Sequence, residues 1–520
     1  MQATRNRVLF CLGLALTFGV SHTAVADVKL PAVFSDHAVL QQGVAVPVWG
    51  WAEPGEEVTV TVAGQTKTAK AGADGAWRVT LDALKPGEAL TLTVRGKNTL
   101  AVQDVLVGEV WLGSGQSNMG LTVSSCNDYA KEQAAAALPK FRMFTVDRVV
   151  GKTPQKDCTG KWVVCASNTV GAFSATAYFF GRDLHQKLGV PVGMINSSWG
   201  GTPIEAWTSD DALKSVPALK PVTDLWVAKT ATPWDEAKAK DAYDKQVVTW
   251  KEAVKKAKTA GRQPPRGPKK AIDPRLDSHY PANLFNGMIA PLIPYAITGA
   301  VWYQGESNAN DLTATLYGTQ LQTLIQDWRT RWGAEFPFAW VQLPNYHASD
   351  RNWPLVREGM LQTLKMPKTG MAITMDIGET GNIHPKNKQD VGHRLAFWAL
   401  DTVYGQKAAS ISGPLPAGHT VRGGEVVCTF THADGGLTAK GGELKGFVIA
   451  GADQKWVPAT AKIAGETVVV SSPDVKAPVA VRYAWAADPG CNLFNGAGIP
   501  ASPFRTDTFE FPLAVAAPRK

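Results

Sequence analysis

Between residues 105 and 412, short apolar runs alternate with stretches of helical periodicity, and this alternation is the strongest constraint on the fold. The apolar runs lie at 105–112, 192–201, 296–307, 338–343 and 370–378. Helical patterns lie between them, among others at 175–188, 316–332 and 388–403. Strands that alternate with helices form a parallel sheet with helices on both faces. The sequence therefore predicts an α/β domain over residues 105–412.

The segments on either side of this domain have a β pattern. Residues 27–104 alternate apolar and polar side chains between turns rich in Gly and Pro, which predicts a small amino-terminal β-sandwich. Residues 413–490 again show short β runs, which predict an ancillary β domain attached after the α/β domain or inserted near its end. Residues 491–520 are then a return segment and tail.

The chain has 520 residues, too many for one ordinary domain, and its 45% apolar content is ample for several cores. Residues 209–280 interrupt the α/β rhythm with a Lys/Ala-rich amphipathic stretch, which we interpret as an insertion. Its basic run at 251–270 is typical of a solvated helix and its connecting loop, the alternative being a patch that binds polyanions. We expect no nucleic-acid partner.

Residues 1–26 have the order of an export signal. Arg5 and Arg7 precede an apolar run from Val8 to Val20, and Ala24-Val-Ala26 forms a small-residue cleavage site. We therefore expect an exported protein, periplasmic or extracellular, that begins at Asp27. Removal of the signal takes away two arginines and no acid, which lowers the formal charge from +8 to +6. No later segment has the apolar length of a membrane span, so we expect no membrane partner.

Of the six cysteines, Cys11 lies in the signal and five remain, an odd number for an oxidising compartment. Disulfides are plausible between Cys126 and either Cys158 or Cys165, and between Cys428 and Cys491. No Cys-x-x-Cys or His-rich spacing indicates a metal site, and we expect no cofactor.

The strand at 105–112 is followed by Gly113-Ser-Gly115 and then by Gln116-Ser117-Asn118. A serine on a tight turn after a central strand lies at the carboxyl edge of the sheet, where α/β proteins bind ligands, and the following amides can bind an oxyanion. The turn lacks the Gly-Lys-Ser/Thr of a phosphate-binding loop, and Met119 replaces the second glycine of a nucleophile elbow. By itself this segment is also compatible with an ordinary loop.

Polar clusters follow the other strands too, at 196–202, 304–308 and 381–386. Brought to one sheet edge, they supply the parts that acyl transfer needs: the Ser117 nucleophile, the His384 base, backbone N–H groups at Gly200 and Gly201, and an amide donor at Gln304 or Asn308. Four clusters at successive strand ends favour a catalytic site over unrelated loops.

The blocks GSGQSNM, NSSWGGTPIEAW, WYQGESNA and IHPKNKQDVGHRLAFWAL resemble the sialate O-acetylesterase-like carbohydrate esterases of the SGNH hydrolase superfamily. The stretch LPAVFSDHAVLQQGVAVPVWGWAEPGE resembles their amino-terminal β domain, and the resemblance extends from about Leu30 to the end of the chain. It implies a three-layer α/β/α hydrolase domain without a metal, which removes O-acetyl groups from sugars through a serine acyl-enzyme.

The resemblance also implies roles for single residues. Ser117 is the expected nucleophile and His384 the base. The expected oxyanion hole consists of the Ser117 N–H, an N–H of Gly200 or Gly201, and the Gln304 side chain. The expected substrate contacts are Asn118, Trp199, Glu306 and Asn308.

One position departs from the superfamily, which places an Asp three residues before the His, where this chain has Gly381. The acid that orients His384 is then Asp376, Glu379 or Glu306, or the enzyme is a Ser–His dyad. We favour Asp376, because a carboxylate at a strand end close to the His loop is well placed.

The sequence leaves the substrate open. Eighteen tryptophans suit stacking on sugar rings, although most tryptophans are core residues. Sialic acid needs a cationic partner such as Arg357 or Lys386, whereas a neutral plant hemicellulose needs only aromatic and amide groups. Because the site blocks show no cationic cluster, the hemicellulose is the favoured substrate and an O-acetylated sialic acid the alternative. A non-catalytic carbohydrate-binding protein is the alternative of another class, which the pairing of Ser117 with His384 disfavours.

Overall fold

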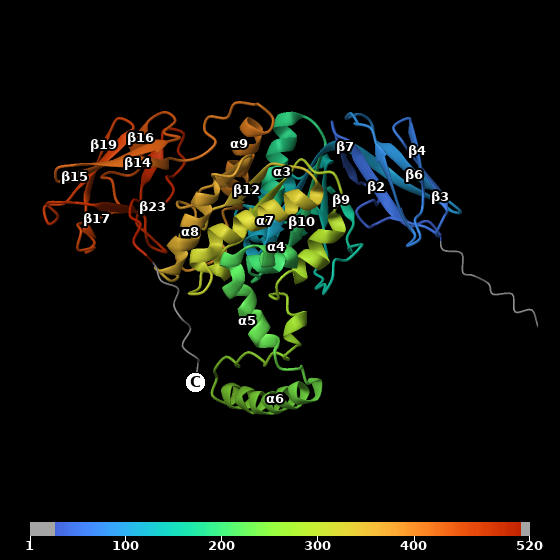
Figure 1. The fold of residues 1–520 in the computed structure, drawn as a ribbon, viewed down its shortest axis with the longest axis horizontal. Helices are drawn as coiled ribbons and strands as arrows, with labels where there is room; N and C mark the ends of the chain where they lie inside the picture. The colour runs from blue at the N-terminus through green and yellow to red at the C-terminus, as the bar shows by residue number, and fades with distance from the viewer. Residues whose placement is uncertain (1–26, 511–520) are drawn as a thin grey trace, which may run out of the picture.

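The structure is a computed structural model that describes residues 27–510. The expected export signal, residues 1–26, lies outside the described residues. The protein is a mixed α/β structure with a large central sheet and several separate antiparallel sheets. Figure 1 shows the α/β unit in the middle, an amino-terminal β domain in blue at one end and a carboxyl-terminal β domain in orange and red at the other.

The 17-residue strand β7 (Thr99–Gly115) belongs to two parts of the fold. Its first half pairs antiparallel with β6 (Leu90–Arg95), and β1 (Val39–Gln41) pairs parallel with its middle. Its second half lies between two parallel partners, β10 (Val192–Ser198) and β11 (Gly299–Tyr303). The strand therefore runs without interruption from the amino-terminal β domain into the centre of the α/β unit.

The central part of the sheet has the order β13-β12-β11-β7-β10-β8-β9. The remaining strands are β12 (Phe338–Val341), β13 (Thr369–Ala372), β8 (Leu138–Thr145) and β9 (Trp162–Cys165). Each neighbouring pair is parallel except β8 with β9. The five strands predicted after residue 105 are present, whereas β8 and β9 were not predicted.

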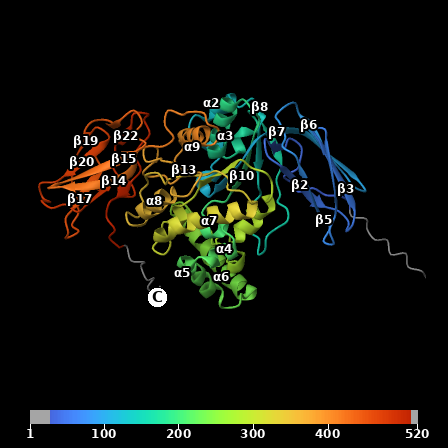
Figure 2. The same cartoon turned by 45° about the horizontal axis from the view of Figure 1, so that its top comes forward.

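Helices cover both faces of this sheet, as Figure 2 shows. On one face lie α3 (Ala175–Leu188) and α9 (Lys388–Thr402), and on the other α7 (Tyr317–Trp332) and α8 (Asn352–Thr363). Successive residues of β11 alternate between the two apolar cores: Val301 and Tyr303 pack in the core that contains α3 and α9, and Ala300 and Trp302 in the core that contains α7 and α8. This alternation follows from the two-residue period of a strand. It also explains why β11 is apolar throughout.

The amino-terminal β domain has two sheets that share one apolar core. Its further strands are β2 (Val46–Trp51), β3 (Glu57–Val62), β4 (Gln65–Lys70) and β5 (Ala76–Leu81). β2 pairs with β5, while β4, β3, β6 and β7 form the second sheet. In β3 the apolar Val58, Val60 and Val62 point inward and polar residues point outward, as the alternating sequence predicts.

The carboxyl-terminal β domain has its own core between antiparallel sheets. One sheet contains β14 (Leu415–Arg422), β15 (Glu425–Thr431), β19 (Thr460–Ala464) and β20 (Thr467–Ser471). A second contains β17 (Phe447–Ala450), β18 (Val457–Pro458), β21 (Ala480–Tyr483) and β23 (Phe504–Arg505). The pair β16 (Leu437–Ala439) and β22 (Leu493–Asn495) completes it. Two of these strands thus come from the segment after residue 490.

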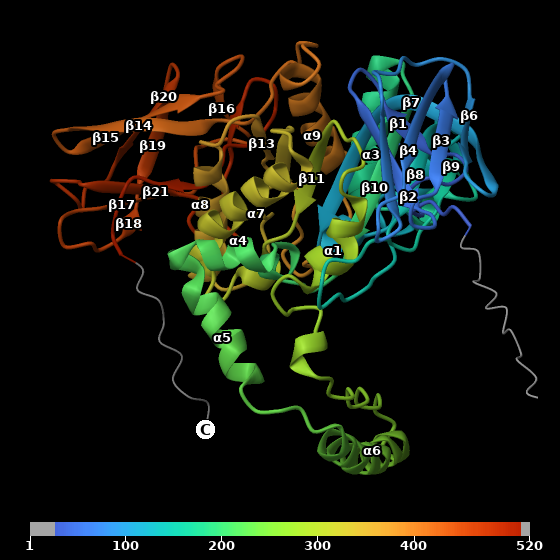
Figure 3. The same ribbon diagram turned by 45° about the vertical axis from the view of Figure 1, so that its right-hand side comes forward.

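The expected insertion consists mainly of helices. α4 (Asp210–Ser215) lies against α7, whereas α5 (Lys220–Thr230) and the 24-residue α6 (Glu236–Thr259) project away from the sheet (Figure 3). In α6, Ala257 is the only buried residue, and ion pairs join Lys240 to Asp244 and Asp241 to Lys245. Residues 251–259 of the basic run therefore lie in a largely solvent-exposed helix, and residues 260–270 follow it outside any helix or strand. Within residues 27–510, no helix is both long and apolar enough to cross a membrane.

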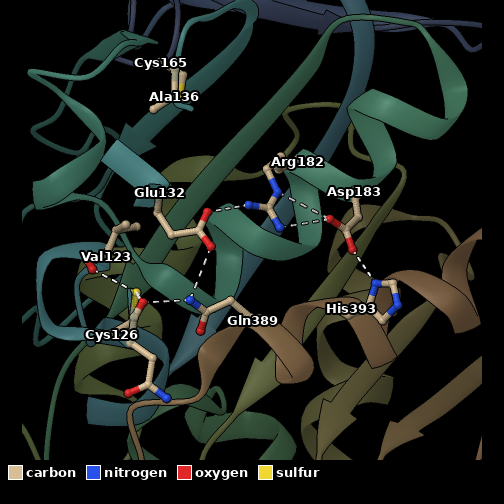
Figure 4. A network of polar contacts seen from close by, with 10 residues as sticks. Val123, Cys126, Glu132, Ala136, Cys165, Arg182, Asp183, Gln389 and His393 are labelled. Atoms are coloured by element: carbon tan, nitrogen blue, oxygen red, sulfur yellow. Dashed lines mark hydrogen bonds and ion pairs between the residues drawn. The ribbon is translucent and has the colours of Figure 1, made fainter. Parts of the chain in front are cut away.

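The five described cysteines are free thiols, so neither of the disulfides considered from the sequence is formed. The Cys126 thiol donates to the Val123 carbonyl oxygen at 2.9 Å, and the Cys165 thiol donates to the Ala136 carbonyl oxygen at 3.4 Å (Figure 4). Burial raises the pKa of Cys126 to about 11 and that of Cys165 to about 12. These sulfur atoms are protonated and point to separate backbone acceptors.

The end of β7 yields a prediction about stability. Gly115 has φ +141°, and a Cβ built on it would lie 2.2 Å from the carbonyl oxygen of Tyr303. Gly64 also has positive φ, +74°, but a Cβ there would meet nothing within 4 Å. We expect Gly115→Ala to lower the free energy of unfolding by about 1–3 kcal/mol more than Gly64→Ala, because the added methyl group overpacks β7 against β11. Thermal unfolding of both variants measures this, and equal losses would contradict the close approach.

Candidate active site

Ser117 stands at the first position of α1 (Ser117–Gly120), directly after the end of β7. The turn is attached to the neighbouring strand, because the Gln116 N–H donates to the Tyr303 carbonyl oxygen at 3.0 Å. The Ser117 hydroxyl lies 2.8 Å from Nε2 of His384. When Oγ–H donates to Nε2, the neutral imidazole carries its proton on Nδ1. This is the geometry in which the imidazole can take the serine proton.

His384 lies in the loop between β13 and α9, and the loop is held by its own polar groups. The His384 N–H donates to Asn382 Oδ1 at 3.0 Å, and the Asn382 amide donates to Glu379 Oε2 at 2.9 Å. The second oxygen of Glu379 accepts from the Lys386 N–H at 2.7 Å. Glu379 therefore fixes the backbone on both sides of His384 rather than its imidazole.

The helix that follows the loop is anchored by a second polar network, shown in Figure 4. Gln389, in the first turn of α9, donates to Glu132 of α2 (Tyr129–Ala134) at 3.3 Å. Glu132 also accepts from Arg182 of α3 at 2.6 Å, and the next residue, Asp183, lies 2.7 Å from Nδ1 of His393. These contacts hold α9 against α2 and α3.

A buried cation lies behind the nucleophile. Nζ of the fully buried Lys388 donates to Asn118 Oδ1 at 2.7 Å. The Asn118 amide donates to Glu306 Oε1 at 2.6 Å and to the carbonyl oxygen of Ile383 at 2.9 Å. Asn118 thus joins the Ser117 turn to the residue that precedes His384.

Burial shifts the pKa values of Lys388, Glu306 and His384. It lowers the pKa of Lys388 to about 7 and raises the pKa of the Glu306 carboxyl. The pKa of His384 is lowered, first by burial and second by the positive charge of Lys388. Both effects favour the neutral imidazole, which is the form that accepts a proton.

Ser117 and His384 open into a pocket of about 360 Å³. Its lining residues are Ser117, Gly120, Leu121, Thr122, Ser125, Arg148, Trp199, Gly200 and His384. Trp199 was expected to contact substrate and does line the pocket, whereas Asn118 and Glu306 lie behind it. Within residues 27–510, no group of three or more His, Cys, Asp or Glu side chains is arranged to hold a metal ion.

Of the two glycines considered for the oxyanion hole, Gly200 is the one beside the nucleophile. A Cβ built on Gly200 would lie 3.2 Å from Cβ of Ser117, whereas one built on Gly201 would meet nothing within 4 Å. In the described chain, neither the Ser117 N–H nor the Gly200 N–H donates to another protein group. Both N–H groups are therefore available to an oxyanion at the pocket.

Gln304 and Asn308 occupy different positions from those expected. Both are fully buried, and the two hydrogens of the Gln304 amide go to the Thr202 carbonyl oxygen at 3.2 Å and to Asn308 Oδ1 at 2.7 Å. The Asn308 amide donates to Glu205 at 3.0 Å. With their donors used inside the protein, Gln304 has none for an oxyanion and Asn308 has none for substrate. Each supports the loop that carries the glycines.

The structure contradicts the expected contact between Asp376 and His384. Both oxygens of Asp376 accept from Arg394 of α9, at 2.7 and 2.8 Å. Glu379 accepts a hydrogen bond from the backbone N–H of Lys386, and Glu306 accepts one from the Asn118 amide. Among the described residues, no carboxylate hydrogen-bonds to Nδ1 of His384. Asp376 therefore holds α9 and does not orient the imidazole.

The cations suggested for a sugar carboxylate are also placed differently. Arg357 is fully buried and far from solvent, where its guanidinium donates to the carbonyl oxygens of Leu343, Pro344, Ala486 and Ala487. Lys386 is exposed and is not among the pocket residues. Arg148, which the sequence analysis did not single out, lines the pocket instead. It follows β8, a strand that was not predicted.

A serine hydroxyl that donates to an imidazole, beside free backbone N–H groups, is the arrangement of a carboxylic ester hydrolase. Residues 279–400 match the family described as carbohydrate esterase, sialic acid-specific acetylesterase. The sialate O-acetylesterase of Homo sapiens is 32% identical, over 95% of this chain and 95% of that protein. That of Mus musculus is 31% identical, over 95% of this chain and 97% of that protein.

Among solved structures, a carbohydrate acetylesterase from Xanthomonas citri is 37% identical, with a TM-score of 0.79, over 93% of this chain and 100% of that chain. This chain belongs to the sialate O-acetylesterase family of carbohydrate esterases. It is a carboxylic ester hydrolase, as the sequence predicted.

The position of Asp376 leads to a prediction about activity. Because its carboxylate pairs with Arg394, we expect Asp376→Asn to lower kcat/KM for 4-nitrophenyl acetate by no more than about tenfold, or about 1.4 kcal/mol. The melting temperature should fall, because Arg394 loses its charged partner. A loss near the roughly 10⁴-fold seen when a triad carboxylate is removed would return Asp376 to the catalytic site.

The environment of His384 predicts the pH dependence. Its imidazole must be neutral to act as base, and its pKa lies below the usual 6.5. Activity is then lost as pH falls through that lowered pKa, so the acid limb of kcat/KM should have its midpoint below pH 6.5. Lys388→Met removes a nearby positive charge and should move the midpoint to higher pH.

Lys386→Met is the matched control, because it removes an exposed cation from the same loop. We expect it to move the midpoint less than Lys388→Met does. An acid limb at or above pH 6.5 in the parent enzyme would contradict the assigned environment, and circular dichroism confirms that each variant folds.

Proposed function

We propose that this chain removes O-acetyl groups from sialic acid through a serine acyl-enzyme. The observation that carries the reaction is the 2.8 Å contact between Ser117 Oγ and His384 Nε2 in an open pocket. The substrate is supported by the relatives named sialate O-acetylesterase, which align over nearly the whole chain. This substrate replaces the plant hemicellulose, which was favoured from the sequence because the site blocks show no cationic cluster.

The geometry supports a two-step reaction. Ser117 Oγ attacks the acetyl carbonyl carbon while its proton passes to Nε2 of His384. The oxyanion that forms is bound by the N–H groups of Ser117 and Gly200. The sugar oxygen then leaves with the proton from Nε2, and the acetyl group remains on Ser117. Water, deprotonated by the same nitrogen, then attacks the acetyl carbon. The bond to Ser117 Oγ breaks, acetate is released, and Nε2 returns the proton to Oγ.

We further propose that the enzyme is a Ser–His dyad on a three-layer SGNH-type domain. All three candidate acids are engaged elsewhere, so the orientation of His384 comes from its loop. The contacts that support this are the Asn382 side chain on the His384 N–H and the Asn118 amide on the Ile383 carbonyl oxygen. Both hold the peptide bond between Ile383 and His384, and the Asn382 amide also donates to the His384 carbonyl oxygen at 2.9 Å, on the other side of the imidazole.

A direct test is the release of acetate from O-acetylated sialic acid, set beside O-acetylated xyloglucan and xylan. We expect the sialic acid to be the best substrate of the three, and Ser117→Ala to lower the rate by at least about 10³-fold, as for other serine nucleophiles. Ser114→Ala is the matched control, because it removes from the same segment a buried hydroxyl that has no hydrogen-bond partner among the described residues.

Two results would contradict the proposal. Faster acetate release from xyloglucan or xylan than from the sialic acid would support the hypothesis that hemicellulose is the substrate. Equal, slow release by the parent and Ser117→Ala would favour a carbohydrate-binding protein without catalysis.

A further inference from the structure

Arg148 is held at the edge of the catalytic pocket by groups on β10 and the segment after it. Its Nε donates to the carbonyl oxygen of Ser198, the last residue of β10, at 3.4 Å. Its guanidinium carbon lies 6.0 Å from the centre of the Trp199 ring. These contacts fix the base of the guanidinium and leave its two terminal nitrogens for another partner.

The guanidinium lies beside the turn that carries the nucleophile. A Cβ built on Gly120 would be 3.9 Å from Nη2 of Arg148. Gly120 is the last residue of α1, and Ser117 is the first, so one helical turn of roughly 5 Å separates them. A monosaccharide can therefore contact Ser117 through one substituent and Arg148 through another.

The residues that line the pocket carry a positive charge and no negative charge. Of the lining residues, Arg148 is the only one with a permanent charge, and none is a carboxylate. Asp147, its neighbour in the chain, lines a different pocket. Across residues 27–510, no carboxylate pairs with Arg148, and neither Nη1 nor Nη2 donates to a protein acceptor. The pocket thus offers a cation whose charge the protein does not neutralise.

We infer that Arg148 binds the carboxylate of an acidic sugar whose acetyl ester lies at Ser117. A guanidinium has a planar array of donors that matches a carboxylate in a bidentate pair, and such charge-assisted hydrogen bonds are about twice as strong as neutral ones. Trp199 and the Ser198 carbonyl oxygen restrict its orientation, which reduces the entropy lost on binding. A neutral sugar offers the cation no matching charge.

This inference rests on the proposed function and adds the residue that selects the substrate. Two kinds of sugar carry such a carboxylate, the sialic acids and the uronic acids. Both are tested, so that recognition of any sugar carboxylate can be distinguished from recognition of sialic acid in particular.

The experiment measures kcat and KM for acetate release from matched substrates. The acidic ones are an O-acetylated sialic acid and an O-acetylated glucuronic acid, and each is compared with its own carboxamide, which has nearly the same shape and no charge. The parent is compared with Arg148→Met, Arg148→Lys and the control Lys152→Met, which removes an exposed cation four residues away.

We expect the parent to prefer the sialic acid to its carboxamide by about tenfold, equivalent to about 1.4 kcal/mol, mainly through KM. Arg148→Met should abolish that preference, because the KM for the sialic acid rises to that for its carboxamide. Arg148→Lys should keep part of the preference, because it retains the charge without the bidentate geometry. Lys152→Met should keep all of it.

The failures of the two proposals are distinct. If the parent deacetylates the sialic acid and Arg148→Met keeps the full preference over the carboxamide, the role of Arg148 is wrong and the proposed function stands. A preference for the glucuronic acid that depends on Arg148 supports the inference and overturns the sialic acid substrate. If neither acid is preferred to its carboxamide by the parent, the inference fails. If 4-nitrophenyl acetate is hydrolysed but neither acid releases acetate, both proposals fail.

Discussion

The register of β7 with its two parallel neighbours determines where the chemistry is. Gly113 to Gly115 pair with Asn196 to Ser198 on one side and with Val301 to Tyr303 on the other. Three strands therefore end at the same level, and the residues that follow them meet at one edge. Glycine at position 115 allows β7 and β11 to approach closely at this edge. The nucleophile, Gly200 and the polar loop after β11 come together because of this register.

Behind that edge the protein buries polar groups instead of apolar ones. Lys388, Asn118 and Glu306 are removed from solvent and hydrogen-bond in series. Buried ionisable groups cost free energy unless they are paired, so such a series is a weak source of stability. Its effect is geometric: Asn118 holds the Ser117 turn and the His384 loop at a fixed separation. Two segments more than 260 residues apart are thereby kept in hydrogen-bonding range.

The strand and helix pattern was readable from the sequence, and so was the pairing of Ser117 with His384. Periodicity fixes which segments are strands, and parallel strands bring their carboxyl ends together whatever the side chains do. The direction of a polar side chain is different, because it depends on partners that periodicity does not locate. Asp376 faces Arg394, and Gln304 faces Thr202 and Asn308. Arg148 was not predicted as a site residue because it follows β8, and the sequence of β8 has no clear apolar pattern.

Arg357 shows how the carboxyl-terminal β domain is joined to the α/β unit. Its buried guanidinium is shared between carbonyl oxygens at 343 and 344, after β12, and at 486 and 487, after β21. Burial lowers its pKa to about 9, which reflects the cost of keeping a cation there. If the β domain came away alone, this cation would lose half of its acceptors while the other half stayed buried. That partly unfolded state is therefore penalised, and the arginine makes unfolding of the two regions cooperative.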